Sequence, residues 1–197
     1  MLKDIALVVN YARDLGIRVV PEFDTPGHTK SWGKGQPDLL TNCISSGVSE
    51  RNYGPINPSN EANFEFLKNL FQEISKLFPD FYLHLGGDED MNGNYKKLEG
   101  FYMKRLIDIV NNLKTKKGYS SREEIFANGN EIPQNTIVQI WKENFSDEKA
   151  TSAGHRVIIS FCWYLDLVTY GDDWFYKFYN CDPHQYVETQ QHIFLVY

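Results

Sequence analysis

Apolar side chains recur every three to four residues in three segments of the chain, which predicts three amphipathic helices. The first covers residues 4–15 and ends at Gly16, the residue type that most readily takes the left-handed conformation after a helix. The second follows residues 57–59 and stops at Pro79, and the third continues to Leu113. We expect these apolar positions to face the core: Ile5, Val8, Val9, Ala12 and Leu15; Phe64, Leu67, Phe71, Ile74 and Phe78; and Leu98, Tyr102, Leu106, Ile109 and Leu113.

Short β-branched or apolar runs lie between and after these helices and predict buried strands. The predicted strands cover residues 17–20, 81–85, 123–127, 136–141 and 156–161. Residues 29–58 are rich in Gly, Pro and Ser, so we expect a long loop there. Strands that alternate with helices favour parallel βα units. Residues 128–135 are too few for a helical crossover, so a loop must replace a helix at that link.

Polar and aromatic residues follow the ends of successive predicted strands. They are Glu22, Asp24 and His28 after the first, Asp88 and Glu89 after the second, and Trp141, Glu143, Trp163, Tyr164 and Asp166 after the last two. A doubly wound sheet also places ligands at strand ends, but repeated acidic and aromatic residues there are typical of a (β/α)8 barrel. The prediction is an α/β fold, a partial (β/α)8 TIM barrel. Because eight units take ~250 residues, roughly five of the eight strands are present.

The composition excludes several classes of protein. A net charge of −6 and a pI ≈ 5.4 argue against nucleic acid as a partner, because a phosphate-binding protein needs a basic face. The longest apolar runs, at 5–9 and 193–197, fall far short of the ~18 residues that a membrane span requires. The chain contains 13 Phe, 12 Tyr and 4 Trp, so we expect some aromatic side chains on stacking surfaces rather than in the core.

The three cysteines, Cys43, Cys162 and Cys181, are too few and too scattered for a disulfide scaffold. They form no CxxC pair, so neither a zinc site nor a redox motif is predicted, and no cofactor is expected. The first residues lack the basic and apolar regions of a signal peptide. We therefore expect either a cytosolic protein or a true start upstream of residue 1.

Asp88 and Glu89 form the sharpest group of candidate catalytic residues. They follow Gly86 and Gly87 at the end of a predicted strand, where glycines let a ligand approach the backbone closely. Two carboxylates in one pocket push their pKa values apart, so that one stays protonated as an acid while the other is ionised. A helix N-cap followed by an acid in the first turn gives the same pattern. Spacing alone does not decide between these interpretations.

His28 has three interpretations: a proton shuttle, a metal ligand, or a histidine satisfied within its own turn. The last is favoured for an isolated histidine. A metal site formed with Glu22, Asp24 and the pair 88–89 is an alternative, although nothing in the sequence fixes a ligand geometry.

The aromatic residues at strand ends also have two interpretations. Trp141, Trp163 and Tyr164 are core residues by default, as is any single ring. As platforms at the strand ends they would suit sugar rings, whose apolar faces stack on aromatic side chains. Residues 144–146 match the N-glycosylation pattern, a tripeptide that is also expected by chance.

Several separated blocks of the chain resemble the β-N-acetylhexosaminidases of glycoside hydrolase family 20. They are residues 4–32, which include EFDTPGH at 22–28, and then FPDFYLHLGGDE at 78–89, QIW at 139–141, WYLD at 163–166 and YGDDW at 170–174. The stretch 78–89 is the most specific of them. The resemblance covers roughly residues 4–180 and is closest to the animal lysosomal-type enzymes.

The resemblance implies a retaining exo-hydrolase of terminal, non-reducing β-linked GlcNAc or GalNAc, in a family that uses the substrate's own 2-acetamido group. It assigns Glu89 as the general acid and then the base. Asp88 orients the acetamido group and stabilises the positive charge, and His28 supports the acid through a hydrogen-bonded chain. Trp141 walls the acetamido pocket, and Tyr164 hydrogen-bonds the acetamide oxygen.

Further positions bear on specificity and on departures from the family. Asp166 is expected to hold sugar hydroxyls, and its pairing with Leu167 resembles the subunit type that prefers neutral sugars. Arg122 stands where the family has a pocket tryptophan. A cysteine expected after Glu89 is missing, which leaves Cys43 without its usual disulfide partner.

The resemblance assigns residues 1–183 to the central part of a family 20 catalytic barrel and residues 184–197 to a divergent tail. The expected partners are glycans, glycolipids or chito-oligosaccharides that end in N-acetylhexosamine, and a dimer of the full-length protein is left open. It implies a lysosomal or secreted full-length parent. A non-catalytic sugar- or partner-binding remnant of the family is the alternative, and a metallohydrolase, which a chelator would inhibit, is a more distant one.

We expect the 197 residues alone to be inactive and to unfold or aggregate, because an incomplete barrel exposes unpaired strand edges and apolar surface. Size-exclusion chromatography with light scattering, followed by a thermal melt of the purified chain, checks this. A monodisperse species with a cooperative melt contradicts it.

Overall fold

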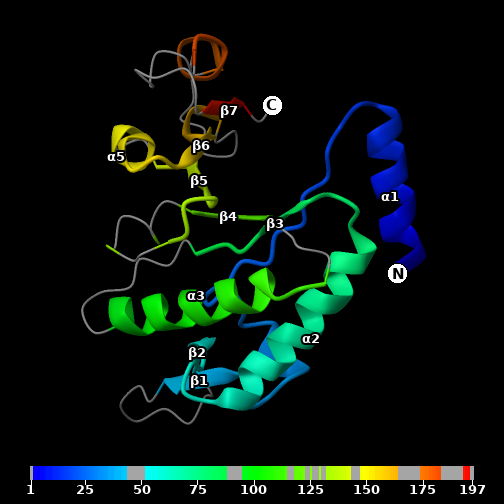
Figure 1. Cartoon of the computed structure of the whole chain (residues 1–197), viewed down its shortest axis with the longest axis vertical. Coiled ribbons are helices and arrows are strands. Elements are labelled where there is room, and N and C mark those ends of the chain that lie inside the picture. The colour runs from blue at the N-terminus through cyan, green and yellow to red at the C-terminus, as the bar shows by residue number, and fades with distance from the viewer. Residues whose placement is uncertain are drawn as a thin grey trace. The chain divides into compact units, whose positions relative to one another are not determined.

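The computed structural model divides the chain into two compact units, Met1–Tyr119 and Ser120–Tyr197 (Figure 1). The residues that it describes are 2–43, 52–87, 95–114, 118–122, 125, 129, 132–142, 147–163, 174–182 and 193–195. Among these, no helix is both long enough and apolar enough to cross a membrane.

The first unit contains the three predicted helices: α1 (Leu2–Asp14), α2 (Glu61–Leu77) and α3 (Tyr95–Asn111). Helix α2 begins where the Asn60 side chain accepts a hydrogen bond from the Ala62 N–H, and it ends before Pro79. Its buried face contains Phe64, Leu67 and Phe71, as the periodicity predicts.

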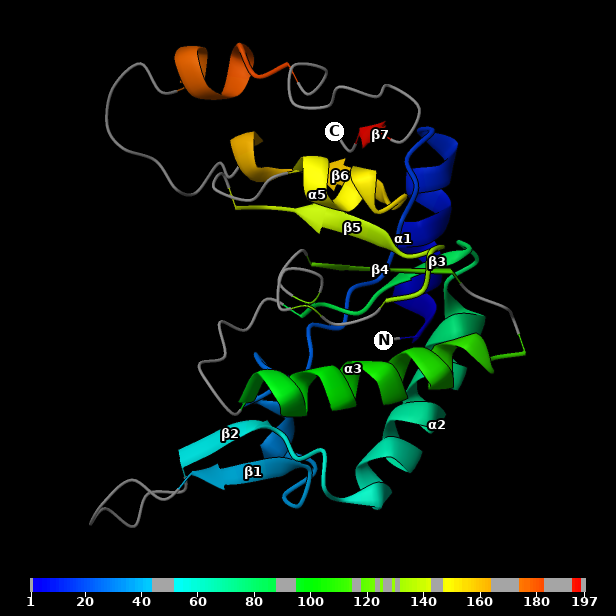
Figure 2. The ribbon, with the colours of Figure 1, turned by 60° about the vertical axis from the view of Figure 1, so that its left-hand side comes forward.

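Helix α3 buries a face slightly rotated from the predicted one. Tyr102, Leu106 and Leu113 are buried as expected, but Leu98 is 47% exposed. Met103, Ile107 and Val110 complete the buried stripe instead. In both views α3 lies between β3 (Tyr82–His84) and the hairpin formed by β1 (Leu40–Cys43) and β2 (Asn52–Ile56) (Figure 1, Figure 2).

Helix α1 forms as predicted, but its apolar face is mostly exposed. Val9 is buried, whereas Val8, Leu15 and the neighbouring Leu7 and Tyr11 are exposed in this unit. The spacing therefore predicted the helix correctly and the burial of Val8 and Leu15 incorrectly. Periodicity indicates that a helix has an apolar stripe, but it contains no information on which part of the protein covers that stripe.

The strand predicted at residues 17–20 is wrong. Pairing starts later, where the Pro21 carbonyl accepts from the His84 N–H at 2.9 Å and the Phe23 N–H donates to the His84 carbonyl at 3.0 Å. The parallel bridge joins Glu22 to His84. Ile17 and Val20 are exposed, so the β-branched side chains that led to this prediction do not belong to a buried strand.

The long loop predicted at residues 29–58 is also wrong in part. It contains a short 3-10 helix, η1 (Trp32–Lys34), and the antiparallel hairpin of β1 (Leu40–Cys43) and β2 (Asn52–Ile56). Buried side chains at Leu40 and Ile56 hold the hairpin against the unit. These two apolar residues are isolated within a Gly-, Pro- and Ser-rich segment, which hid the strands from a pattern search.

Strand β3 and the first residues of strand β4 belong to the first unit, and β4 continues into the second. Strand β3 (Tyr82–His84) confirms the predicted strand at 81–85, and Leu83 and Leu85 are buried. Strand β4 (Gly118–Arg122) begins where the Gly118 N–H donates to the Phe81 carbonyl. Of the strand predicted at residues 123–127, the structure describes Ile125, which is helical rather than extended, and the other four residues lie outside the described residues.

The second unit is a parallel sheet in chain order. Strand β4 is followed by β5 (Ile137–Ile140), β6 (Arg156–Ile159) and β7 (Ile193–Leu195), and α5 (Asp147–Ser152) links β5 to β6. The strands predicted at 136–141 and 156–161 are confirmed. The apolar cluster beneath the sheet consists of Val138, Ile140, Ala150, Val157 and Ile159.

Two short helices follow β6: η2 (Phe161–Trp163) and the π-helix η3 (Trp174–Tyr179). A disulfide joins Cys162 to Cys181, with their Cα atoms 6.2 Å apart, inside the usual range for such a bond. The sequence argued only against a disulfide scaffold and left the state of these two cysteines open. Their 19-residue separation hid the pairing, because a local sequence pattern carries no information on contacts between distant residues.

Candidate active site

The turn that carries His28 and the glycines that precede Asp88 lie at the same end of two paired segments. The backbone of residues 21–23 runs parallel to β3, so the chain leaves both segments in the same direction. One exit continues into Asp24 and Thr25, and the other into Gly86 and Gly87. Parallel pairing thus brings together two of the sequence blocks that were predicted to meet at strand ends.

Asp24 contacts both glycines of the second exit. Its Oδ1 accepts a hydrogen bond from the Gly87 N–H at 3.1 Å. Gly86 has a φ of +71° and Gly87 a φ of +97°, both in the left-handed region that favours glycine. A Cβ on Gly86 would collide with the side chain and backbone of Asp24 and lie 2.8 Å from the Thr25 nitrogen. The close approach therefore requires glycine at position 86.

Two further hydrogen bonds fix the exit of β3. The Gly86 N–H donates to His84 Nδ1 at 3.1 Å, and the Thr25 hydroxyl donates to the Leu85 carbonyl at 3.4 Å. Glu22 Oε1 lies 3.5 Å from the same His84 nitrogen. Side chains of the first segment therefore hold the backbone of the second up to the residue before Asp88.

Tyr102 of α3 supports the turn from its buried side. It is almost completely buried and lies against Thr25. Burial raises the pKa of the Tyr102 hydroxyl well above its usual range, an effect that the neighbouring Thr25 side chain partly opposes. The hydroxyl therefore stays protonated and neutral beneath the turn.

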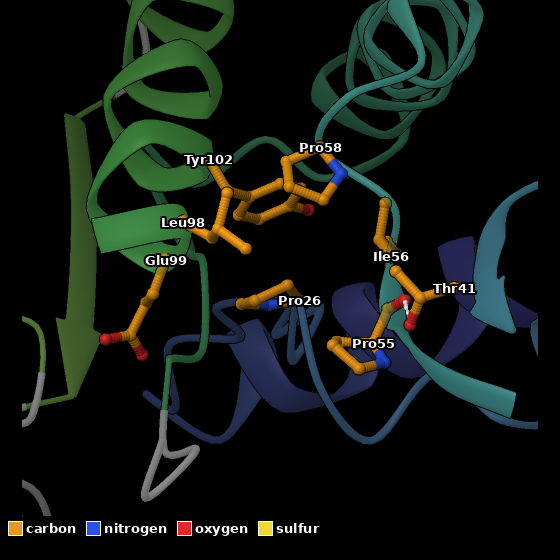
Figure 3. Close-up of a pocket in the computed structure, with 8 residues that line it drawn as sticks. All are labelled: Pro26, Thr41, Pro55, Ile56, Pro58, Leu98, Glu99 and Tyr102. Carbon is orange, nitrogen blue, oxygen red and sulfur yellow. Dashed lines mark hydrogen bonds between the residues drawn. The ribbon is translucent and has the colours of Figure 1, made fainter. Parts of the chain in front are cut away.

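A small cavity lies next to Tyr102 (Figure 3). It is lined by Pro26, Thr41, Pro55, Ile56, Pro58, Leu98, Glu99 and Tyr102. Its volume of about 30 Å³ accommodates a water molecule or two. Ligand pockets measure ~300 Å³ or more, so this cavity belongs to the packing beneath the turn and is not a sugar site.

His28 is exposed at the end of the turn, with a φ of 52°. Trp141 follows β5 in the second unit, is half-buried, and has Lys142 Nζ 5.1 Å from its ring centroid. The other predicted site residues, Asp88, Glu89, Tyr164, Asp166 and Leu167, lie outside the described residues. The structure therefore places two of the predicted residues, one in each unit.

The carboxyl ends of β5 and β6 are joined directly beside Trp141. The Ser160 N–H donates to the Ile140 carbonyl at 2.9 Å, and the Gln139 side-chain amide donates to the Ser160 hydroxyl at 3.0 Å. This pairing orders the backbone directly before Trp141, the residue that the family resemblance assigns to the acetamido pocket.

A metal site built on Glu22, Asp24, His28, Asp88 and Glu89 was one of the predicted alternatives, and the last two of these residues lie outside the described residues. Among the residues that the structure describes, no three His, Cys, Asp or Glu side chains gather closely enough to hold a metal ion. Asp24 and Glu22 are instead engaged with Gly87 and His84.

The family model described as the catalytic domain of glycosyl hydrolase family 20 matches residues 2–100 and 90–193. The chain belongs to glycosyl hydrolase family 20. This confirms the resemblance inferred from the blocks at 22–28 and 78–89. Both blocks are the ones that parallel pairing brings together in the first unit.

Two curated relatives within family 20 are subunits of β-hexosaminidase. The human subunit β is 41% identical over 210 residues, which cover 95% of this chain and 37% of that protein. The rat subunit α is 43% identical over 205 residues, which cover 92% of this chain and 38% of that protein. The chain therefore spans less than two fifths of the length of these relatives.

Solved family 20 structures share the fold. The exo-β-N-acetylglucosaminidase of Vibrio harveyi in complex with N-acetylglucosamine matches with a TM-score of 0.69 and 27% identity, over 80% of this chain and 28% of that one. The fold of the chain is thus the TIM-barrel-like α/β fold of family 20 catalytic domains.

Sequence inspection missed the contact that organises the first unit. It listed Asp24 as a metal-ligand alternative and Gly86 as a residue that admits a ligand, whereas the two touch each other. The two glycines after β3 were an available signal, because glycine is the usual residue where another backbone approaches closely.

Replacing Gly86 by alanine in the full-length protein is expected to lower the thermal-unfolding midpoint strongly, because its Cβ collides with Asp24. Gly16→Ala is the matched control. Its φ of +77° is similar, but nothing lies within 4 Å of the added Cβ. The expected loss of stability is therefore only the cost of a left-handed backbone for alanine, about 1–2 kcal/mol. Differential scanning calorimetry checks both, and equal shifts for the two variants would show that the contact with Asp24 does not constrain position 86.

Proposed function

We propose that the full-length protein is a β-N-acetylhexosaminidase that removes terminal, non-reducing β-linked GlcNAc or GalNAc with retention of configuration. The observation that carries this is the family 20 membership together with 41% identity to human β-hexosaminidase subunit β. The N-acetylglucosamine bound to the Vibrio harveyi relative supports the class of sugar.

In the first step, Glu89 donates its proton to the glycosidic oxygen as the bond from that oxygen to the anomeric carbon breaks. The carbonyl oxygen of the substrate's 2-acetamido group attacks the anomeric carbon from the opposite face and forms an oxazolinium-like ring. Asp88 orients the acetamido group and stabilises the positive charge that develops on it. The substrate therefore supplies the nucleophile, and the enzyme supplies the acid and the counter-charge.

In the second step, Glu89 acts as a base. It takes a proton from a water molecule that attacks the anomeric carbon, and the oxazolinium ring opens to restore the acetamido group. Two successive displacements at the same carbon give net retention. Glu89 ends the cycle protonated, ready for the next substrate.

The hydrogen bonds at the exit of β3 support this assignment. Asp88 follows Gly87 directly in the chain, and Gly87 is hydrogen-bonded to Asp24 four residues before His28. Catalysis by positioned carboxylates requires that the backbone that carries them is held rigidly. We assign His28 to the support of Glu89 through a hydrogen-bonded chain.

The remaining substrate contacts are assigned to the strand ends of the second unit. Trp141 forms a wall of the acetamido pocket, Tyr164 hydrogen-bonds the acetamide oxygen, and Asp166 holds sugar hydroxyls beside Leu167. Trp141 lies half-buried directly after β5, at the strand end where the family resemblance places this wall.

In the full-length protein, residues 1–183 form the central part of the catalytic barrel with roughly five of its eight strands, and residues 184–197 form a divergent tail. The natural substrates are glycans, glycolipids or chito-oligosaccharides with a terminal N-acetylhexosamine. We assign the parent to the lysosome or to secretion, which the Cys162–Cys181 disulfide supports because such bonds persist in oxidising compartments.

A non-catalytic, sugar-binding relative is the second candidate. It is favoured by Arg122, which ends β4 in register with Gln139, two residues before Trp141. The family resemblance expects a tryptophan at this position, and a cation in its place would remove apolar surface on which an acetamido methyl group packs. Hydrolysis that depends on Glu89 separates the two candidates.

Glu89→Gln in the full-length protein is expected to lower kcat on an aryl β-GlcNAc substrate by about 10²–10⁴-fold, since the amide cannot transfer a proton. Release of the aryl alcohol, followed by absorbance, measures the rate. Glu65→Gln is the matched control, because Glu65 is an exposed α2 residue paired with Lys68. If the parental protein shows no hydrolysis beyond the level of the Gln variant at position 89, the enzyme assignment fails.

The pair Asp166 and Leu167 generates a specificity prediction. A carboxylate near the sugar hydroxyls repels a sulfate group, so a 6-sulfated aryl β-GlcNAc is expected to be turned over at least about tenfold more slowly than the neutral substrate. Asp166→Asn is expected to narrow this ratio. Comparable kcat/KM on the two substrates with the unmodified protein would refute the preference for neutral sugars.

A further inference from the structure

Trp141 and Lys142 are consecutive residues whose side chains meet. The Lys142 Nζ lies over the Trp141 ring, 5.1 Å from its centroid. Within a strand, consecutive side chains point to opposite faces of the sheet and do not meet. Strand β5 ends at Ile140, and residues 141 and 142 belong to neither a strand nor a helix. The contact therefore depends on the chain leaving the strand geometry directly before Trp141.

The backbone before Trp141 is held by the neighbouring strand. Ile140 is paired with Ile159 of β6 in the parallel register. The Ile140 carbonyl also accepts hydrogen bonds from Ser160, from its N–H at 2.9 Å and from its hydroxyl at 3.3 Å. A tryptophan side chain has two rotatable bonds beyond the backbone. The orientation of the Trp141 indole therefore depends on the contacts of the side chain itself.

The Lys142 ammonium is a contact of this kind. The face of an aromatic ring carries partial negative charge and attracts a cation, and tryptophan attracts it most strongly. Both Trp141 and Lys142 are half-buried, whereas Lys149 on α5 is exposed. A partly desolvated ammonium gains more from an aromatic ring than a fully hydrated one does. The pair thus restricts the rotation of the indole at the end of β5.

We propose that Lys142 is a positioning residue, which holds the Trp141 indole in the orientation against which the substrate's N-acetyl group packs. The proposal rests on the proposed function, in which Trp141 walls the acetamido pocket. In that reaction the N-acyl group is also the nucleophile. An indole that is free to turn would admit larger N-acyl groups and would align the acetamide oxygen less well for its attack. Lys142 therefore contributes to the choice of the N-acyl group.

The test uses the full-length protein and Lys142→Met, which keeps a flexible side chain and removes the charge. Two aryl β-glucosaminides, one N-acetylated and one N-propanoylated, are compared through the ratio of their kcat/KM values. Lys142→Met is expected to narrow this ratio about two- to fivefold, the effect of losing one cation–π contact. The ratio does not depend on the amount of active protein, so a merely structural role leaves it unchanged. Lys149→Met in α5 is the matched control, with the parental ratio expected.

Further variants and a spectroscopic signature keep the test decisive. Lys142→Arg retains a cation that stacks on aromatic rings and is expected to keep the parental ratio. If Lys142→Met does not fold, Lys142→Gln takes its place with the same expected narrowing. In protein labelled with 5-fluorotryptophan, the ¹⁹F resonance of Trp141 is assigned through Trp141→Phe. It is expected to shift when Lys142 is neutralised and to stay in place in Lys149→Met.

Three outcomes overturn the proposal. They are a parental N-acetyl to N-propanoyl ratio in the neutral variants of Lys142, a ratio in Lys142→Arg that narrows as far as theirs, and an unchanged ¹⁹F resonance of Trp141. Failure of the proposed function is distinct, because the parental protein then shows no Glu89-dependent hydrolysis. In that case the Kd values of free N-acetyl- and N-propanoylglucosamine, from isothermal titration calorimetry, supply the ratio. A protein that neither hydrolyses nor binds either sugar refutes both proposals.

Discussion

The first unit depends on the close approach between Asp24 and the two glycines that leave β3. The pairing of residues 21–23 with β3 sets the direction of both chains, but it does not bring their exits into contact. The Gly87 N–H bound to Asp24 does so, and only a residue without a Cβ fits at position 86. A carboxylate, a missing side chain and a left-handed backbone are therefore needed together, and none of them is replaceable alone.

The helices hold this contact in place from outside. The ring of Phe23, one residue before Asp24, packs against Phe71 of α2 with 5.7 Å between their centroids, and Tyr102 of α3 lies beneath Thr25. The helices are joined by Arg105, which binds Glu61 through two nitrogens and lies 4.3 Å from the Phe64 ring centroid. Since an exposed ion pair contributes little to stability, the buried aromatic contacts carry most of this support.

The sequence predicted those features that repeat with a regular period. Helices α2 and α3 and strands β5 and β6 each bury several residues at their own spacing, so the pattern found them. The strand predicted at residues 17–20 was wrong because β-branched residues favour an extended backbone whether or not a neighbouring strand pairs with them. The Asp24–Gly86 contact and the disulfide join residues far apart in the chain, and a local pattern contains no information on such pairs.

The two units stabilise their strand exits by different means, and the sizes of their elements explain the difference. Helices α2 and α3 have 17 residues each, and their buried side chains pack against the turn that contains Asp24 and Thr25. The helical elements described in the second unit have six residues or fewer, and an isolated helix of that length is not stable in water. Closing a loop of this size with a disulfide contributes about 3 kcal/mol by restricting the unfolded chain, as much as burying a whole leucine side chain. The disulfide thus stabilises the strand exits of the second unit, as the packed helices stabilise those of the first.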